Sequence, residues 1–148
     1  MSNYVIDENV VRNAWTGKKP DENPALAEMK FMRDIFFGNQ HLAINLKIRS
    51  KFTKWSKQAE QISANVDNLL IPLFMKLIFN SERTMIVDGI HTNFRGVKDC
   101  DIEFVGVTLQ APNGVLVTAD VKLVEAIAAD TEVNHCRCIT AEEALKTY

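Results

Sequence analysis

The sequence predicts a three-layer α/β/α domain with a mostly parallel central sheet. Short apolar segments rich in β-branched residues alternate along the chain with longer segments of helical periodicity. The segment VLV at 115–117 is continuously apolar, as expected for a strand that is buried on both faces. The chain has 148 residues, which suits one domain with a substantial core, so we expect a single domain over residues 1–148.

The composition narrows the classes of function. The net charge is −2, so no global basic field by itself indicates a nucleic-acid partner. The longest apolar run, LLIPLFMKLIF, is interrupted by Pro72 and Lys76, which argues against a membrane span or membrane partner. No basic segment followed by an apolar one opens the sequence, and the three cysteines do not form a disulfide framework. We therefore expect a cytoplasmic protein.

Local signals mark where the predicted elements begin and end. Asn23 followed by Pro24 predicts an N-cap with proline at the first helical position, and Gly38 closes that helix. Pro72 either starts or kinks a later helix. Thr140 opens a capping box for a last short helix. The expected strands are residues 4–6, 41–44, 84–87, 115–117 and 133–139, and the expected helices are residues 9–16, 24–37, 48–59, 68–79, 100–110 and 121–130, with 88–96 as a loop.

Aspartates stand at the ends of predicted core elements, although acids normally occupy solvated faces. Asp7 follows the first strand and Asp120 follows the strand at 115–117, so both belong at the carboxyl edge of a parallel sheet, where sites form in such folds. Asp99 is predicted as an N-cap, and Asp101, in the first turn of the same helix, can reach that edge. Each of these aspartates could instead serve only to cap a helix or favour its dipole.

Three carboxylates that face one crevice repel one another unless a positive charge neutralises them. A divalent cation held by oxygen ligands is the simplest solution, and Asp7, Asp101 and Asp120 are therefore candidate metal ligands.

Two further clusters leave alternatives open. Lys47, Lys51 and Lys54 lie along one predicted helix, either as a solvated face or as a rim that faces RNA phosphates. The segment HCRC at 135–138 contains potential zinc ligands, but it lacks a fourth ligand and the usual wider spacing. We therefore favour buried thiols there.

Three motifs in the same order resemble those of the PIN-domain nucleases. They are VIDENVV at 5–11, Asp101 followed by apolar residues as far as Thr108, and VLVTAD at 115–120. The resemblance covers essentially the whole chain.

The resemblance implies a Mg²⁺- or Mn²⁺-dependent endoribonuclease. Asp7, Asp101 and Asp120 would be catalytic metal ligands, and Asp99 would supply an additional carboxylate. Asn9 and Thr118 would hold those ligands by hydrogen bonds. Many relatives are toxins of toxin–antitoxin pairs and dimers are usual, so the resemblance also implies an antitoxin partner and a homodimer. The apolar residues available for such an interface include Phe31, Phe36, Phe37 and Trp55.

One position departs from the family pattern. Lys51 stands where the family usually carries a glutamate. Its ammonium could replace a second metal ion, or it could abolish metal binding and leave a PIN-fold protein that binds RNA or a protein without cutting. A phosphatase or other small-substrate hydrolase is less well supported, because the sequence contains neither a glycine-rich phosphate loop nor a G-x-S-x-G elbow.

Overall fold

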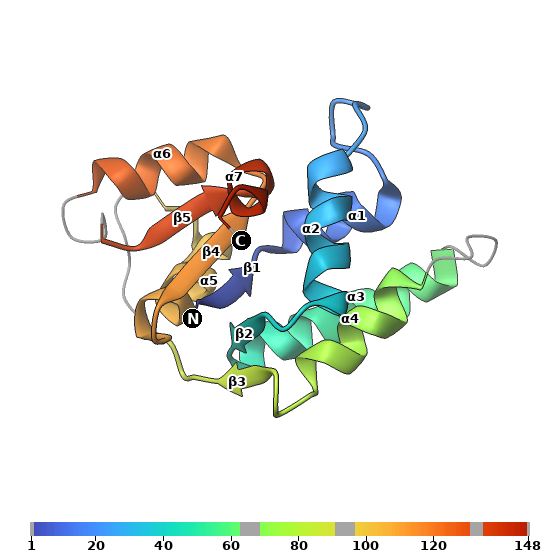
Figure 1. The fold of residues 1–148 in the computed structure, drawn as a ribbon, viewed down its shortest axis with the longest axis horizontal. Helices are drawn as coiled ribbons and strands as arrows, with labels where there is room; N and C mark the ends of the chain where they lie inside the picture. Colours follow the sequence, from blue (N-terminus) through green and yellow to red (C-terminus); the bar gives the residue numbers. More distant parts are fainter. Residues whose placement is uncertain (1, 63–68, 91–96, 131–134, 148) are drawn as a thin grey trace.

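Five parallel strands form one sheet at the centre of the computed structural model, which describes residues 2–62, 69–90, 97–130 and 135–147 (Figure 1). The strands are β1 (Asn3–Ile6), β2 (His41–Ile44), β3 (Thr84–Ile86), β4 (Gly114–Thr118) and β5 (Arg137–Thr140). The helices are α1 (Glu8–Thr16), α2 (Leu26–Phe37), α3 (Leu46–Ile62), α4 (Leu70–Ile78), α5 (Asp99–Gln110), α6 (Val121–Ala129) and α7 (Ala141–Leu145).

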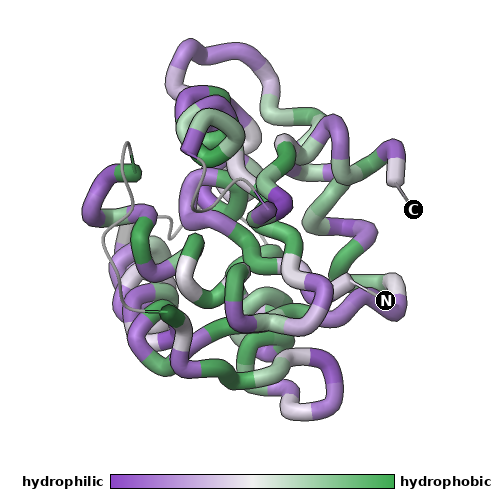
Figure 2. Tube along the Cα trace, turned by 90° about the vertical axis from the view of Figure 1, so that its left-hand side faces the viewer, coloured by the Kyte–Doolittle hydropathy of each residue, from purple (hydrophilic) through white to green (hydrophobic). Residues whose placement is uncertain are grey.

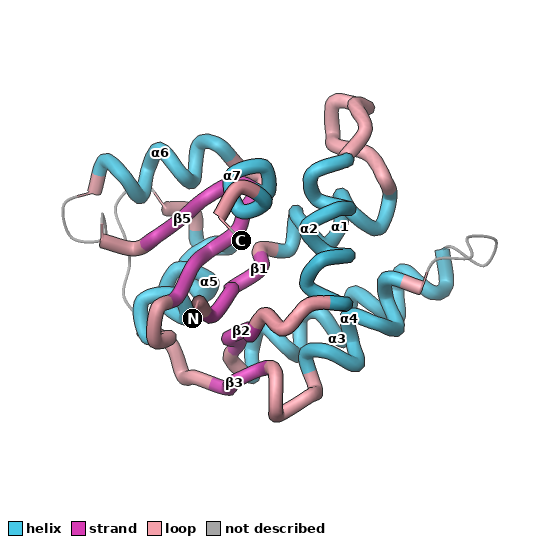
Figure 3. The backbone as a smooth tube through the Cα atoms, in the orientation of Figure 1, coloured by secondary structure: helices cyan, strands magenta, loops and turns pink. Residues whose placement is uncertain are grey.

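Helices cover the sheet on both sides. Helix α5 packs on β1, β2 and β4, and α6 packs on β4 and β5. Helices α1, α2 and α4 pack together on the other side of the sheet (Figures 1 and 3). The predicted three-layer α/β/α fold with a parallel sheet is confirmed. In the described part of the chain, no helix is both long enough and apolar enough to cross a bilayer.

The order of the strands is β3-β2-β1-β4-β5, so the chain reverses its direction across the sheet between β1 and β4. Ile6 of β1 pairs with Val117 of β4 in parallel register. Asp7, which follows Ile6, and Thr118, the last residue of β4, therefore lie side by side at the carboxyl edge of the sheet. Ligands of open parallel sheets bind at such a reversal point.

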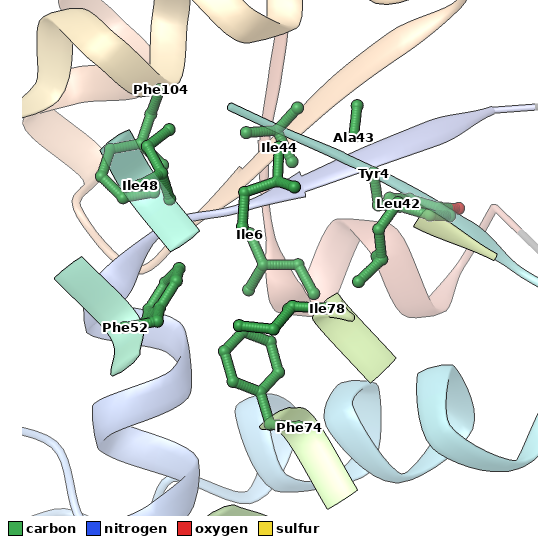
Figure 4. Close-up of a pocket in the computed structure, with 11 residues that line it drawn as sticks. Tyr4, Ile6, Leu42, Ala43, Ile44, Ile48, Phe52, Phe74, Ile78 and Phe104 are labelled. Atoms are coloured by element: carbon green, nitrogen blue, oxygen red, sulfur yellow. The ribbon is translucent and has the colours of Figure 1, made fainter. Parts of the chain in front are cut away.

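An aromatic cluster joins the helices to the sheet. The Phe52 ring of α3 meets Phe74 of α4 and Phe104 of α5 edge-on, with ring centroids 4.9 and 6.3 Å apart. Ile6 and Ile44 face this cluster from the sheet, and the void that remains is only about 10 Å³ (Figure 4). Hydrophobic and hydrophilic positions alternate along the helices in Figure 2, as amphipathic packing requires. The packing holds α3 and α5 in fixed positions beside the carboxyl edge.

Two predicted helix N-caps are wrong. Helix α2 begins at Leu26 with Ala25 as its N-cap, because Lys18 and Pro24 form a β-bridge and the Ala25 N–H donates to the Gly17 carbonyl at 3.0 Å. Asn23 and Pro24 thus belong to the preceding loop. Helix α5 begins one residue early, with Lys98 as its N-cap, so Asp99 lies in the first turn, where the helix dipole favours it.

Other boundaries also differ, and α3 runs from Leu46 to Ile62 rather than over residues 48–59. Pro72 lies in the first turn of α4, where its missing N–H breaks no helical hydrogen bond, so it helps to start the helix. Strand β5 begins at Arg137 rather than at residue 133, and its last residue, Thr140, accepts a hydrogen bond from the Glu143 N–H at 3.3 Å, as the N-cap prediction requires. Residues 68, 91–96, 133 and 134 lie outside the described residues.

Candidate functional site

A polar cavity of about 210 Å³ lies at the carboxyl edge of the sheet, where β1, β4 and the start of α5 meet. Asp7, Asn9, Asp101 and Asp120 all line it, so the structure brings together four of the residues that the sequence singled out. They come from three segments far apart in the chain. Asp99 is exposed and does not line the cavity.

Thr118 joins the ends of β1 and β4 through one hydroxyl. Its Oγ1, which is fully buried, donates to Asp7 Oδ2 at 2.8 Å. The same oxygen accepts from Asn9 Nδ2 at 3.3 Å and from the Asp120 N–H at 3.1 Å. Asn9 Oδ1 in turn accepts from the Ala119 N–H at 3.0 Å. These bonds fix the position of the Asp7 carboxylate relative to Asp120.

The surroundings of Asp7 disfavour its charged form. It occupies the N-cap position of α1, yet its side chain makes no capping hydrogen bond, and only 4% of its surface is exposed. Burial raises the pKa of Asp7 from 3.8 to about 6 against the lowering effect of the Thr118 hydrogen bond, and the Asp101 charge raises it further. A nearby cation would relieve both unfavourable effects.

Asp101 has a similar but milder environment. Burial raises its pKa most, and the Asp120 charge also raises it. The Cys100 thiol hydrogen bond and the positive charges of Lys98 and Lys51 lower this pKa. The pKa of Asp7 is thus raised by the charge of Asp101, and that of Asp101 by the charge of Asp120.

One carboxylate oxygen of Asp120 is occupied by backbone hydrogen bonds. Its Oδ1 accepts hydrogen bonds from the N–H groups of Lys122 at 3.0 Å and Leu123 at 3.3 Å, so it caps α6 as one interpretation of the sequence held. Asp120 also lines the cavity. One carboxylate can therefore both cap a helix and face a ligand.

Two cations that the sequence analysis did not single out also line the cavity. Arg12 lies one turn along α1 from Glu8, with which it forms an ion pair, and Lys98 precedes α5. Helical spacing from Asn9 could have indicated Arg12, because residues three apart share a face. Both cations therefore lie beside the aspartates, where they would attract an anionic substrate.

The three candidate RNA-facing lysines do not form one rim. Lys47 Nζ lies 3.1 Å from Glu103 Oε1, which ties α3 to α5. Lys51 is exposed, with its Nζ 5.9 Å from the centroid of the Phe104 ring at the cavity wall. Lys54 lines a separate groove on α3.

That groove, of about 480 Å³, is basic. Lys57 and Arg49 line it with Lys54, and the Arg49 guanidinium lies 4.5 Å over the Phe79 ring.

Glu103 is a half-buried acid that the sequence analysis missed. Besides Lys47, it binds Asn45, whose Nδ2 donates to Glu103 Oε2 at 2.7 Å. Asn45 Oδ1 accepts from the Ile48 N–H at 2.7 Å, as a helix cap does. Glu103 does not line the carboxylate cavity, and its contacts serve to position α3 against α5.

The cysteines of HCRC are protonated thiols. Burial raises the pKa of Cys136 to about 11 and that of Cys138 to about 12. Cys136 is buried and Cys138 half-buried, which matches the interpretation as structural thiols. The charges of Cys136 and of the three cavity aspartates also raise the Cys138 pKa.

The donor set suits a hard divalent cation, because all of its charged ligands are carboxylates. In the described residues, no group of three or more His, Cys, Asp or Glu side chains is close enough to hold a metal ion directly. Mg²⁺ is usually bound by only one or two carboxylates and keeps several waters. The cavity therefore fits an ion held partly through water.

No family model matches this chain, and comparison with curated proteins and with solved structures gave no match either.

Proposed function

We propose that this chain is a Mg²⁺- or Mn²⁺-dependent endoribonuclease of the PIN type. The observation that carries the proposal is the meeting of Asp7, Asp101 and Asp120 in one cavity at the point where the strand order reverses. The raised pKa values of Asp7 and Asp101 support it, because they mark a site whose negative charges lack sufficient neutralisation.

The chain's own residues have distinct parts in this proposal. Asp7, Asp101 and Asp120 would hold the ion, which when bound supplies an activated water and neutralises charge on the phosphate. Thr118 and Asn9 keep the Asp7 carboxylate in place. Arg12 and Lys98 line the same cavity and would bind phosphate oxygens of the RNA backbone.

Calorimetric titration with Mn²⁺ tests the metal site directly. We expect saturable binding by the wild type and its loss in Asp101→Asn. Asp99→Asn is the matched control, because Asp99 lies two residues away in the same helix, is exposed and does not line the cavity. It should bind Mn²⁺ like the wild type.

Cleavage of structured RNA in the presence of Mn²⁺ then tests the activity. We expect cleavage by the wild type and Asp99→Asn and none by Asp101→Asn. Absence of cleavage by the wild type, or equal cleavage by all three proteins, would contradict the proposal.

The second candidate is a PIN-fold protein that binds RNA or a protein without cleavage. The proximity of Lys51 to Asp101 favours it, since the lysine charge already neutralises part of the acidic site. This candidate predicts no Mn²⁺ binding even with RNA present. It also predicts RNA binding that weakens steeply with salt and depends on the basic groove of Arg49, Lys54 and Lys57.

An antitoxin partner and a homodimer remain proposals within the same function. Of the four aromatic residues considered for an interface, Phe31 is fully buried in the core, Phe36 and Trp55 are partly buried, and Phe37 is 78% exposed. Leu26, also on α2, is 70% exposed, so α2 offers the apolar surface for a dimer. A monomeric mass at micromolar concentration, measured by light scattering, would exclude the homodimer.

A further inference from the structure

The basic groove lies between the outer side of α3 and the end of α4, and it shares no lining residue with the carboxylate cavity. Arg49, Lys54 and Lys57 line it, and no acidic residue belongs to its described lining. Lys54 and Lys57 are exposed and form no ion pair with the described residues. The groove therefore presents uncompensated positive charge on a chain whose net charge is −2.

The positive charges of α3 continue from the carboxylate cavity into this groove. Lys51, Lys54 and Lys57 follow one another at intervals of three residues, so each lies beside the next on the helix surface, about 5 Å further along its axis. The row begins at Lys51, whose Nζ lies 5.9 Å from the Phe104 ring at the cavity wall, and it ends in the groove. A ligand that matches this row carries repeated negative charges.

Phe79 adds a flat apolar surface among the cations. It is the C-cap residue of α4, its side chain is 54% exposed, and the Arg49 guanidinium lies 4.5 Å from its ring centroid. Unpaired bases stack on exposed aromatic rings and on guanidinium planes, while neighbouring cations follow the phosphates. A duplex keeps its base faces covered, so the combination suits a single strand of nucleic acid.

Other polyanions fit the groove less well. The surface of an anionic bilayer is flat, whereas the groove is a concave space of about 480 Å³. An acidic peptide would match the charge, but its carboxylates make no use of a stacked ring and guanidinium. Single-stranded RNA matches both the row of charges and the stacking surface.

We propose that this groove binds a single-stranded RNA segment next to the cleaved bond, with phosphates on Lys54 and Lys57 and a base stacked on Phe79. Lys51 connects the groove to the carboxylate cavity, so that one strand can occupy both. The placement beside a cleaved bond rests on the proposed ribonuclease function. Binding of the strand itself requires neither metal nor cleavage.

Fluorescence anisotropy with a labelled oligouridylate of about 12 nucleotides, on the whole protein in EDTA, tests the stacking surface. Phe79→Ala should weaken binding about tenfold or more, because a base loses its stacking partner. Phe79→Trp is the conservative variant, and it should retain the affinity of the wild type. A labelled RNA duplex of the same length should bind the wild type and Phe79→Ala equally.

The salt dependence of the same titration tests the phosphate contacts. Lys57→Gln should reduce the slope of log affinity against log salt by about 0.7, the value for one lost contact with a single strand. Lys146→Gln is the matched control and should keep the slope, because Lys146 is exposed at the end of α7 and lines neither the groove nor the carboxylate cavity.

Equal oligouridylate binding by the wild type, Phe79→Ala and Lys57→Gln would overturn the inference, as would absence of binding by the wild type. Tighter binding of polyglutamate would assign the groove to an acidic protein. Tighter binding of phosphatidylserine vesicles would assign it to a membrane surface. Either result would also overturn the inference.

Cleavage kinetics in Mn²⁺ separate this inference from the ribonuclease proposal. Phe79→Ala should raise KM about tenfold and leave kcat within about twofold, because Phe79 would hold a flank of the RNA and not the reacting bond. Cleavage with unchanged KM and unchanged oligouridylate binding would overturn the groove and leave the ribonuclease proposal standing. Oligouridylate binding that depends on Phe79 and Lys57, without Mn²⁺ binding or cleavage, would support strand binding in the groove and overturn only the ribonuclease proposal.

Discussion

The ends of β1 and β4 present the same residue type under opposite conditions. Asp7 and Asp120 each stand at the N-cap of the helix that follows a parallel strand. The Asp120 carboxylate caps its helix, whereas Asp7 makes no cap and is buried beside Thr118. The difference shows that an aspartate at the end of a strand is shaped by its tertiary neighbours. Asp120 is anchored by the backbone, while Asp7 bears a desolvated charge that a cation would stabilise.

Asp7→Asn should have the largest effect, on both metal affinity and stability, because it removes the buried carboxylate of the pair. We expect at least a hundredfold loss of Mn²⁺ affinity, measured by calorimetry, because a carboxylate ligand is removed. The same change should stabilise the metal-free protein at pH 8 by up to about 3 kcal/mol, since it removes the charge whose pKa rises from 3.8 to about 6. Urea unfolding in EDTA measures this gain.

Asp120→Asn is the matched control for the gain in stability. Asparagine caps helices as well as aspartate does, so its free energy of unfolding should stay within about 0.5 kcal/mol of the wild type. A metal-free Asp7→Asn protein that is less stable than the wild type would contradict the account of Asp7.

The pH dependence of stability sharpens the comparison. The folded pKa of Asp7, about 6, lies above the unfolded value of 3.8, so the folded state binds the proton more tightly. The contribution of Asp7 to stability is therefore fully present below pH 3.8 and is lost as the pH rises through 6. Relative to Asp7→Asn, the metal-free wild type should lose up to about 3 kcal/mol between pH 4 and pH 7.

Urea unfolding of both proteins across this range measures the difference. A constant difference between them would show that burial does not shift this carboxyl group. In a parallel titration, Mn²⁺ affinity should weaken below pH 6, because the ion must then displace the Asp7 proton.

Thr118→Val should have an intermediate effect on the strand ends. The change leaves Asp7 without its donor, and Asn9 Nδ2 and the Asp120 N–H without their shared acceptor. We expect a loss of about 1–3 kcal/mol in the free energy of unfolding. A carbon-detected NMR titration should show the Asp7 pKa above 6, since the hydrogen bond that lowers it is gone.

Thr108→Val provides the matched control for Thr118. Thr108 is also buried, but its hydroxyl donates to the Phe104 carbonyl within α5 rather than to Asp7. Removal of the Thr108 hydroxyl should leave the Asp7 pKa unchanged. An equal change in both variants would assign the effect to general loosening of the core.

Lys51→Glu should produce the smallest effect. Lys51 is exposed, so stability should change by no more than about 0.5 kcal/mol. Because its charge reaches Asp101, reversal of that charge should raise Mn²⁺ affinity several-fold. Lys54→Glu, one turn further along α3 in the separate groove, should leave the affinity unchanged. Equal increases in the two variants would indicate only a general effect of net charge.

Sequence reasoning located most strands and helices because their signals are local. The β-branched run at 115–117 and the cap at Thr140 depend on neighbouring residues alone. The prediction was wrong at Pro24, where a bridge to Lys18 keeps the chain extended. It was also wrong at Asp99, which lies inside the helix that it was expected to cap. Both errors concern boundaries, where competing local conformations differ little in free energy.

The sequence by itself determined the parallel α/β fold and the placement of Asp7 and Asp120 at one edge, because the periodicity of apolar residues specifies strands and their carboxyl ends. Only the tertiary structure decided that Thr118 donates to Asp7, that Lys51 lies near Asp101, and that Glu28 is buried. These relations depend on side-chain directions and on packing between segments distant in the chain. Periodicity in one dimension carries no information about either.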